Sequence, residues 1–405
     1  MGRRIRIVLY LLSLFAVAGV IAVVFVTGRQ HAAEPVSDSV GMETEVTEEP
    51  AEADRPQVTE EPQMEQTAET VPGDVGMETE TGTGTETEVW DEQETGQVTL
   101  IFTGDVLFAN AFQTGYNAKG IAGVIDDVLL EELKGADILM INNEFPFSDR
   151  GVPMEEKQFT FRCSPSYVKA LSEMGVDIVS LANNHILDYG KEALRDTFDT
   201  LDSAGILYGG AGDTAERAEK LQVIEAGGRR YGFLAVSRVV PTVEWKVEFS
   251  APGVFSCYDD TRLLALITEA KEDCDFLTVY PHWGVEYQAY PEDYQVRFAE
   301  RWIEAGADLI VGSHTHCLQG VSWFDGKPVF YSLGNFVFGR DIDRSAILKV
   351  TVQPDGDVEF VFLPVYASGG VTRLAEETRA EETLRYLDGI SRGAAVGSDG
   401  TVTQE

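Results

Sequence analysis

Acidic residues dominate this 405-residue chain, in which 68 Asp and Glu stand against 31 Lys and Arg and give a formal net charge of −37. A protein that binds nucleic acid carries a basic face, so this balance excludes nucleic acid as a partner. The length allows two or three domains, and we expect one large domain with appendages.

The first 26 residues form a candidate membrane segment. Arg3, Arg4 and Arg6 precede an unbroken apolar run from Ile7 to Val26. A helix of that length reaches roughly 30 Å, the thickness of a bilayer core. We therefore expect a single-pass signal anchor in the cell membrane, with the N-terminus inside and the folded part extracytoplasmic. A cleaved signal peptide is the alternative, although its apolar region is usually shorter.

Residues 27–97 have a different composition. Between residues 31 and 97, 20 acidic residues accompany one arginine, and the strings "GMETE" and "VTEEP" each occur twice. Such a segment has too little apolar surface to offset chain entropy, which predicts a disordered acidic linker. It would act as a spacer or, alternatively, as an interaction tail for cations or wall polymers.

Strand-like and helix-like patterns alternate from residue 98 to about residue 390. The strings "VTLIFTG", "DILMINNE", "VDIVSLANNH", "DFLTVYPHWG" and "ADLIVGSH" are typical of strands, and helical patterns separate them. One helix is predicted to end at Gly205. The last third is a run of strands with Asp-Gly turn signals at 325–326 and 355–356. This alternation predicts an α/β fold with helices on the sheet faces, and residues 391–405 are predicted to be a flexible tail.

Polar residues that can bind a metal ion follow the predicted strands. In open α/β sheets, ligands bind at the carboxyl ends of the strands. Four of the five histidines stand there, and the fifth, His31, lies in the linker. The strand-end residues are Asp105, Asn143, Glu144, Asn183, Asn184, His185, His282, His314 and His316. This donor set predicts a centre for one or two divalent ions such as Mn²⁺, Zn²⁺, Fe²⁺ or Mg²⁺.

Six motifs then give a family resemblance. "TGDVLF", "INNEF", "SLANNHILDYG", "YPHWGVEY", "VGSHTHCLQG" and "YSLGNFVF" occur in an order and spacing similar to the CapA family of poly-γ-glutamate capsule proteins. That family is a branch of the calcineurin-like metallophosphoesterase superfamily. The resemblance covers roughly residues 98–365 and implies a four-layer αββα sandwich. It also implies poly-γ-glutamate or another anionic envelope polymer as the context, with capsule-synthase membrane proteins as candidate partners.

The resemblance implies a role for individual residues. One ion would be bound by Glu144, Asn184, His282 and His314, and a second ion by Asp105, Glu144 and His316. His185 would be the general acid at the leaving group. Leu107 stands where the superfamily usually has a histidine, so the second ion lacks one ligand. Asn110 would either replace that ligand or cap a helix.

Five further residues are candidates for substrate contact or for support of the ligands: Asn143, Asn183, Asn335, Arg162 and Trp283. Alternatives remain open for some of them. Trp283, like Tyr287, would stack on a substrate or pack its own loop, and Arg162 would bind an anionic substrate or pair with a carboxylate. Asn335 would orient a ligand or form a turn.

The four cysteines, Cys163, Cys257, Cys274 and Cys317, would form disulfides outside the cell or remain buried thiols. Three functions fit the sequence. The first is a metal-dependent hydrolase or transferase of the CapA type. The second is a non-catalytic assembly or export component that holds a polymer carboxylate in the metal cleft, and the third is a phosphodiesterase unrelated to capsules. The acidic surface argues against broad capture of a polyanion, so contact should be local.

Overall fold

The computed structural model describes residues 96–405. The predicted signal anchor and nearly all of the predicted linker lie outside this range. Within it, none of the helices combines the length and the apolar character needed to cross a bilayer.

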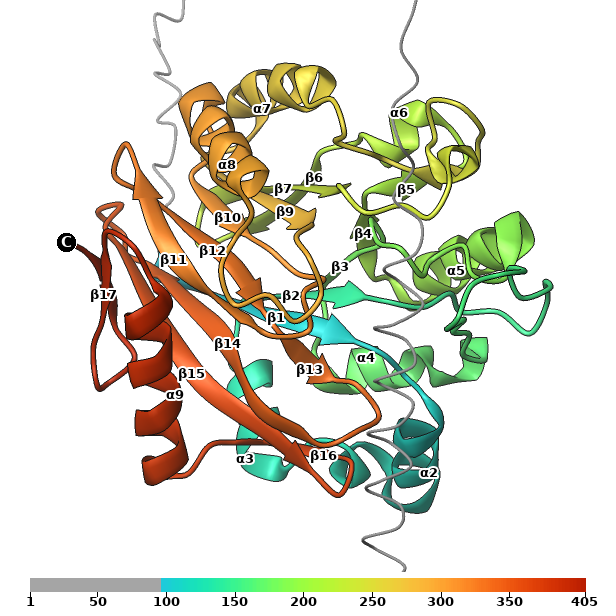
Figure 1. Cartoon of the computed structure of the whole chain (residues 1–405), viewed down its shortest axis with the longest axis horizontal. Helices are drawn as coiled ribbons and strands as arrows, with labels where there is room; N and C mark the ends of the chain where they lie inside the picture. Colours follow the sequence, from blue (N-terminus) through green and yellow to red (C-terminus); the bar gives the residue numbers. More distant parts are fainter. Residues whose placement is uncertain (1–95) are drawn as a thin grey trace, which may run out of the picture. The chain divides into compact units, whose positions relative to one another are not determined.

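The first sheet has eight strands and joins the earliest part of the domain to its last third (Figure 1). Its strands are β1 (Val98–Val106), β2 (Ile138–Asn143), β3 (Ile178–Ser180), β4 (Leu207–Gly209), β13 (Asn335–Val337), β14 (Ile342–Val352), β15 (Val358–Ser368) and β16 (Val371–Leu374). The order is β16-β15-β14-β1-β2-β3-β4, and β13 pairs with the end of β1. β1 to β4 are parallel, whereas β14 to β16 are antiparallel to their neighbours. β1 is central and almost wholly buried, as its continuous apolar run requires.

The second sheet has six strands in the order β11-β12-β10-β9-β7-β6. They are β6 (Gln222–Ala226), β7 (Arg229–Ser237), β9 (Phe276–His282), β10 (Leu309–Val311), β11 (Leu318–Phe324) and β12 (Lys327–Leu333). β7, β9, β10 and β12 are parallel, and the two edge strands pair in the antiparallel sense. The Asp-Gly signal at 325–326 lies between β11 and β12, where the sequence predicts a hairpin.

The two sheets pack face to face through aromatic side chains. The rings of Phe102 and Phe233 lie 6.5 Å apart, and those of Phe330 and Phe362 lie 5.3 Å apart. The hydroxyl of Tyr280 also donates to the carbonyl oxygen of Thr103 across the interface (2.8 Å). These contacts make one continuous core out of both sheets.

Most helices lie on the outer faces of the two sheets, and the C-terminal helix contacts β11 and β15, one strand from each sheet (Figure 1). The helices are α2 (Asn110–Lys119), α3 (Asp127–Lys134), α4 (Val168–Met174), α5 (Gly190–Ala204), α6 (Ala215–Ala218), α7 (Thr261–Asp273), α8 (Asp293–Ala305) and α9 (Glu377–Ile390). α7 and α8 contact the second sheet, and α3 and α5 contact the first. α5 ends at Gly205 with a φ of 71°, as predicted. The expected mixed α/β architecture is therefore confirmed.

Short elements complete the described chain. They are η1 (Gly120–Gly123), η2 (Pro165–Tyr167), η3 (Val243–Trp245), and the pair β5 (Ala211–Gly212) and β8 (Gly253–Val254). η3 and β8 belong to the segment that joins β7 to α7, and this segment contributes residues to the surface beside the functional site.

The predicted flexible tail is wrong for most of its length. β17 (Ala394–Val396) and β18 (Val402–Gln404) form an antiparallel hairpin, in which Val396 is 8% exposed and Val402 4% exposed. The amide of Phe362 in β15 donates to the carbonyl oxygen of Gly400 (2.9 Å). An Asp-Gly turn signal at 399–400 marks the hairpin, and buried valines on both sides of it supply the apolar surface that holds it in place.

Deletion of residues 393–405 should therefore destabilise the domain. Two buried valines contribute about 1.5–3 kcal/mol each, so the free energy of unfolding should fall by roughly 3–6 kcal/mol. Deleting only Gln404 and Glu405, which are exposed, is the control and should change little. Urea unfolding followed by circular dichroism measures both, and equal stability of the long deletion and the wild type would show that the hairpin contributes nothing.

Candidate metal centre

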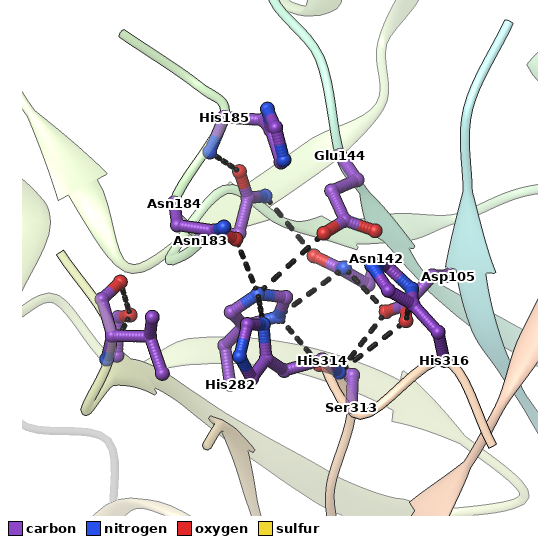
Figure 2. Close-up of polar contacts among 12 residues, drawn as sticks. Asp105, Asn142, Glu144, Asn183, Asn184, His185, His282, Ser313, His314 and His316 are labelled. Atoms are coloured by element: carbon purple, nitrogen blue, oxygen red, sulfur yellow. Dashed lines mark hydrogen bonds and ion pairs between the residues drawn. The ribbon is translucent and has the colours of Figure 1, made fainter. Parts of the chain in front are cut away.

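The predicted ligands converge where the carboxyl ends of strands from both sheets meet (Figure 2). Asp105 lies at the end of β1, Glu144 directly follows β2, and Asn184 and His185 follow β3. From the second sheet, His282 ends β9, and His314 and His316 follow β10. Because parallel strands end at one edge, residues far apart in sequence become neighbours here.

Glu144 is the centre of this cluster and is fully buried. Neither of its carboxylate oxygens has a hydrogen-bond partner. Burial, and next the charge of Asp105, raise the pKa of Glu144 well above its usual range. A buried polar group without a partner is costly, so this carboxylate needs either a proton or a cation.

One group of possible ligand atoms comprises Glu144, His282 and His314, whose atoms lie within 4.8 Å of one another. His282 Nε2 lies 3.1 Å from His314 Nδ1, 2.8 Å from Asn184 Oδ1 and 3.6 Å from Glu144 Oε1. Burial, followed by the neighbouring histidines, lowers the pKa of His282 well below its usual value, and burial lowers that of His314 to about 3. Both rings are therefore neutral at pH 7 and have a lone pair for a cation.

A second group comprises Asp105, Glu144 and His316, also within 4.8 Å. His316 Nδ1 lies 3.3 Å from Asp105 Oδ2 and 2.9 Å from Asn335 Oδ1. Burial lowers the pKa of His316, but the hydrogen bond and charge of Asp105 raise it by more, so the net shift is upward. Glu144 is common to both groups, as the resemblance implies for a bridging carboxylate.

Leu107, which stands where the superfamily usually has a metal-binding histidine, offers no ligand atom in the structure either. Leu107 is 3% exposed and belongs to the hydrophobic core. Asn110 is exposed at the first position of α2, and Ala109 is the N-cap residue, so the predicted cap at Asn110 is wrong.

The backbone between the two histidines is unusual. His314 has a φ of 97° and His316 a φ of 56°, a region that residues other than glycine rarely adopt. The amide of His314 points at the Asp105 carboxylate, 3.3 Å from both oxygens. Such conformations cost about 1–3 kcal/mol each and concentrate at functional sites. The turn thereby directs both imidazoles toward one centre.

Amide and hydroxyl side chains hold the ligands in place. Asn335, where the sequence left a choice between a turn and a ligand contact, lies against His316 as described above. Asn183 donates to Asn142 Oδ1 (3.1 Å) and to the carbonyl oxygen of Asn143 (2.9 Å). The side chain of Asn143 donates to the carbonyl oxygen of Phe145 (2.6 Å) and does not face the ligands through its amide nitrogen.

Two positioning residues were missed by the sequence analysis. Asn142 donates to Asp105 Oδ1 (2.8 Å), and Ser313 Oγ lies 2.9 Å from His282 Nδ1. The Ser313 contact fixes the ring so that Nε2 faces the cluster. A signal for Asn142 was present, because a polar residue inside a strand that is buried throughout requires an internal partner.

His185 stands beside the cluster with its ring turned toward Glu144 (Figure 2). Its Nδ1 lies 2.7 Å from Asp188 Oδ2 and 3.1 Å from Lys157 Nζ. Lys157, a third residue that the sequence did not reveal, also bonds to Asp188 Oδ1 and to the carbonyl oxygen of Asn184. Burial lowers the pKa of His185, so the ring is neutral at pH 7. Lys157 thus connects His185, the predicted general acid, with Asn184, a predicted metal ligand.

Two predicted substrate contacts are not supported. Trp283 is fully buried, donates to the carbonyl oxygen of Tyr331 (2.9 Å) and stacks on Trp302, so its role is packing. Arg162 donates to the carbonyl oxygen of Arg150 (2.7 Å) and lies over the ring of Tyr189, and neither an ion pair nor a cluster contact involves it among the described residues.

Tyr287 remains available for substrate, because 61% of it is exposed at the rim and its ring centroid lies 6.0 Å from that of His316. The open question about the cysteines is also settled by the structure. All four are free thiols, and three of them are buried.

Fold and site together define an α/β protein with a candidate two-ion centre at strand ends. Residues 99–340, more than half of the chain, match the family described as "Bacterial capsule synthesis protein PGA_cap". The chain belongs to this family, which confirms the resemblance seen in the motifs.

Relatives in three organisms agree with this placement. The PGA biosynthesis protein CapA of Bacillus subtilis (strain 168) is 29% identical over 269 residues, which cover 65% of this chain and 70% of the relative. The capsule biosynthesis protein CapA of Bacillus anthracis is 29% identical over 311 residues, or 72% and 74% of the two chains. A probable polyglutamine synthesis accessory protein of Mycobacterium tuberculosis is 29% identical over 283 residues, or 64% and 74%.

The variant Glu144→Gln tests the cluster because it keeps the shape and removes the charge. The pKa of Glu144 is raised in the folded state, so metal-free wild type should lose stability as pH rises above about 4–5, and the variant should not. With EDTA at neutral pH the variant should be at least as stable as the wild type. With Mn²⁺ or Zn²⁺ the wild type should gain in Tm and the variant much less.

Thermal unfolding by circular dichroism, with EDTA and with metal, measures both effects. Glu286→Gln is the matched control, because Glu286 is exposed and contributes only a charge at a distance. An equal metal-induced gain in Glu144→Gln and wild type would rule out Glu144 as a ligand.

Proposed function

We propose that this chain is a membrane-anchored, extracytoplasmic protein of poly-γ-glutamate or related capsule-polymer synthesis, export or processing, and that it is a divalent-metal-dependent hydrolase or transferase. The Bacillus relatives, which are named as proteins of PGA biosynthesis and capsule biosynthesis, support the polymer context. One observation carries the chemistry. The Glu144 carboxylate is buried without a hydrogen-bond partner among three histidines and an aspartate.

The residues present fit one or two divalent ions with a metallophosphoesterase-like arrangement. Glu144, Asn184, His282 and His314 would hold one ion, and Asp105, Glu144 and His316 the other. Ions held by these residues would supply an activated water and stabilise charge at the scissile group. Imidazole nitrogens favour Mn²⁺, Zn²⁺ or Fe²⁺ over Mg²⁺.

His185 is suited to move a proton at this edge. Asp188 accepts from Nδ1, an assignment made from the 2.7 Å contact, and this leaves Nε2 as the reactive nitrogen. Since the ring is neutral at rest, Nε2 would first take up the proton that the attacking water releases and would then deliver it to the leaving group. Lys157 and Asp188 hold the ring in this orientation throughout.

A non-catalytic role in polymer assembly or export is the second candidate, and Leu107 favours it. Its side chain lies in the core, and the four described histidines all occupy other places in the site. A centre whose second ion is weakly held would still bind a polymer carboxylate without cleaving the chain.

Turnover separates the two candidates. Metal-loaded, full-length protein should hydrolyse a phosphodiester or a γ-glutamyl bond. His185→Ala should lower kcat by about 10²- to 10⁴-fold and keep the metal, whereas His282→Ala should lose both. Metal content by elemental analysis accompanies each rate, and Arg230→Gln, at the opposite end of β7, is the control. Bound metal without turnover supports the binding role, and protein that binds no divalent ion contradicts both.

The anchor is a separate part of the proposal, and it rests on the arginines before the apolar run of residues 7–26. Full-length protein should stay in the membrane pellet after an alkaline carbonate wash. Recovery of a shortened, soluble species would show that the segment is a cleaved signal peptide.

A further inference from the structure

A basic side chain lies beside the candidate centre on a neighbouring strand end. Arg238 directly follows β7, whose last residue, Ser237, pairs with His282 at the end of β9. The backbone amide of Arg238 donates to the carbonyl oxygen of His282 (2.9 Å). Arg238 is therefore fixed at the same sheet edge as the ligands.

The guanidinium of Arg238 packs against two aromatic rings, and one of its nitrogen donors has no hydrogen-bond acceptor. It lies 3.9 Å from the ring centroid of Tyr258 and 5.0 Å from that of Tyr294. Its Nε is buried without a hydrogen-bond partner. The hydroxyl of Tyr294 accepts from the amide of Gly284 (2.6 Å), which ties this aromatic wall to the loop that follows His282. A buried donor without an acceptor costs free energy, and an arriving anion would remove that cost.

A second cation shares the same ring. Lys246 Nζ lies 4.1 Å from the centroid of Tyr258. No ion pair formed by the described residues includes Arg238 or Lys246, although acidic residues outnumber basic ones 68 to 31 in the chain. Acidic side chains of the same segment are engaged elsewhere, since Asp260 pairs with Arg301 (2.8 Å) and Glu248 accepts from Ser256 Oγ (2.6 Å). Two neighbouring cations without a counter-charge attract an anion.

We propose that Arg238, Lys246 and Tyr258 form an anion subsite that receives a carboxylate of an acidic substrate chain next to the candidate centre. This inference rests on the proposed function, because it names the residues that would hold that polymer beside the same site. A γ-linked glutamate chain carries a free carboxylate on every residue. One carboxylate on Arg238 would hold the chain at the sheet edge while the next residues extend toward the ligand cluster.

The subsite also explains how a strongly acidic protein can hold an acidic chain. The net charge of −37 repels a polyanion over the surface as a whole. A guanidinium between aromatic rings is a local, partly desolvated exception, where an anion gains most from a charge-assisted hydrogen bond. Binding should therefore depend on these few side chains and weaken steeply with salt.

Calorimetry with γ-linked tetraglutamate tests the subsite on the full-length protein, both metal-loaded and in EDTA. Wild type should bind in both conditions. Arg238→Gln and Lys246→Gln should each weaken binding by about tenfold or more, because each removes a charged donor. The matched control is Arg230→Gln, a partly exposed arginine at the opposite end of β7, which should bind as the wild type does. Thermal unfolding checks that every variant is folded.

Three results would overturn the subsite: undiminished binding by the double variant, binding that requires metal, and full competition by an equal concentration of inorganic phosphate. The last would assign the pocket to phosphate instead of a carboxylate chain. The proposed function fails by different results, namely no divalent ion or no turnover, which leave the binding measured in EDTA unaffected.

Discussion

A buried carboxylate without a donor is the constraint on which the rest of the site depends. Three asparagine side chains lie close to Glu144, yet each amide nitrogen is directed elsewhere: Asn142 toward Asp105, Asn143 toward Phe145 and Asn183 toward Asn142. Solvent is excluded as well. A protein interior that leaves a carboxylate without a hydrogen-bond donor, and places the neutral imidazoles of His282 and His314 beside it, has the properties of a cation site.

The packing of the two sheets sets the geometry around that carboxylate. The hydrogen bond from Tyr280 to Thr103 joins the sheets two residues before His282 on one side and two residues before Asp105 on the other. The ligands on β1 and β9 therefore each lie two residues beyond this link. Precision in the site comes from strands that are buried on both faces, and the loops need only carry the ligands over the last residue or two.

Sequence patterns predicted the parts of this protein that depend on periodicity and position. The strand–helix alternation predicted the architecture, and the clustering of histidines at strand ends predicted which residues would meet. The partners of side-chain ion pairs could not be predicted in the same way, because no sequence pattern around Lys157 indicates that it contacts Asp188. The orientation of Trp283 could not be predicted either, because an aromatic residue next to a ligand gives the same sequence pattern whether it faces solvent or the core. In the structure Trp283 faces the core, where it stacks on Trp302. The C-terminal hairpin was missed because its strands are only three residues each, too short for a period to emerge.

The pairing of β1 with β13 and β14 has a consequence for how the protein is made. Asp105 is opposite Asn335, and Phe102 is opposite Leu348. More than two hundred further residues must therefore be synthesised before β1 has all of its neighbouring strands. β1 and β2 can pair early, but the centre closes only when the turn that carries His314 and His316 arrives. Long-range pairing of this kind slows folding and leaves a hydrophobic strand edge open meanwhile. Until β13 and β14 have been synthesised, the exposed edge of β1 is the surface that a chaperone would need to cover.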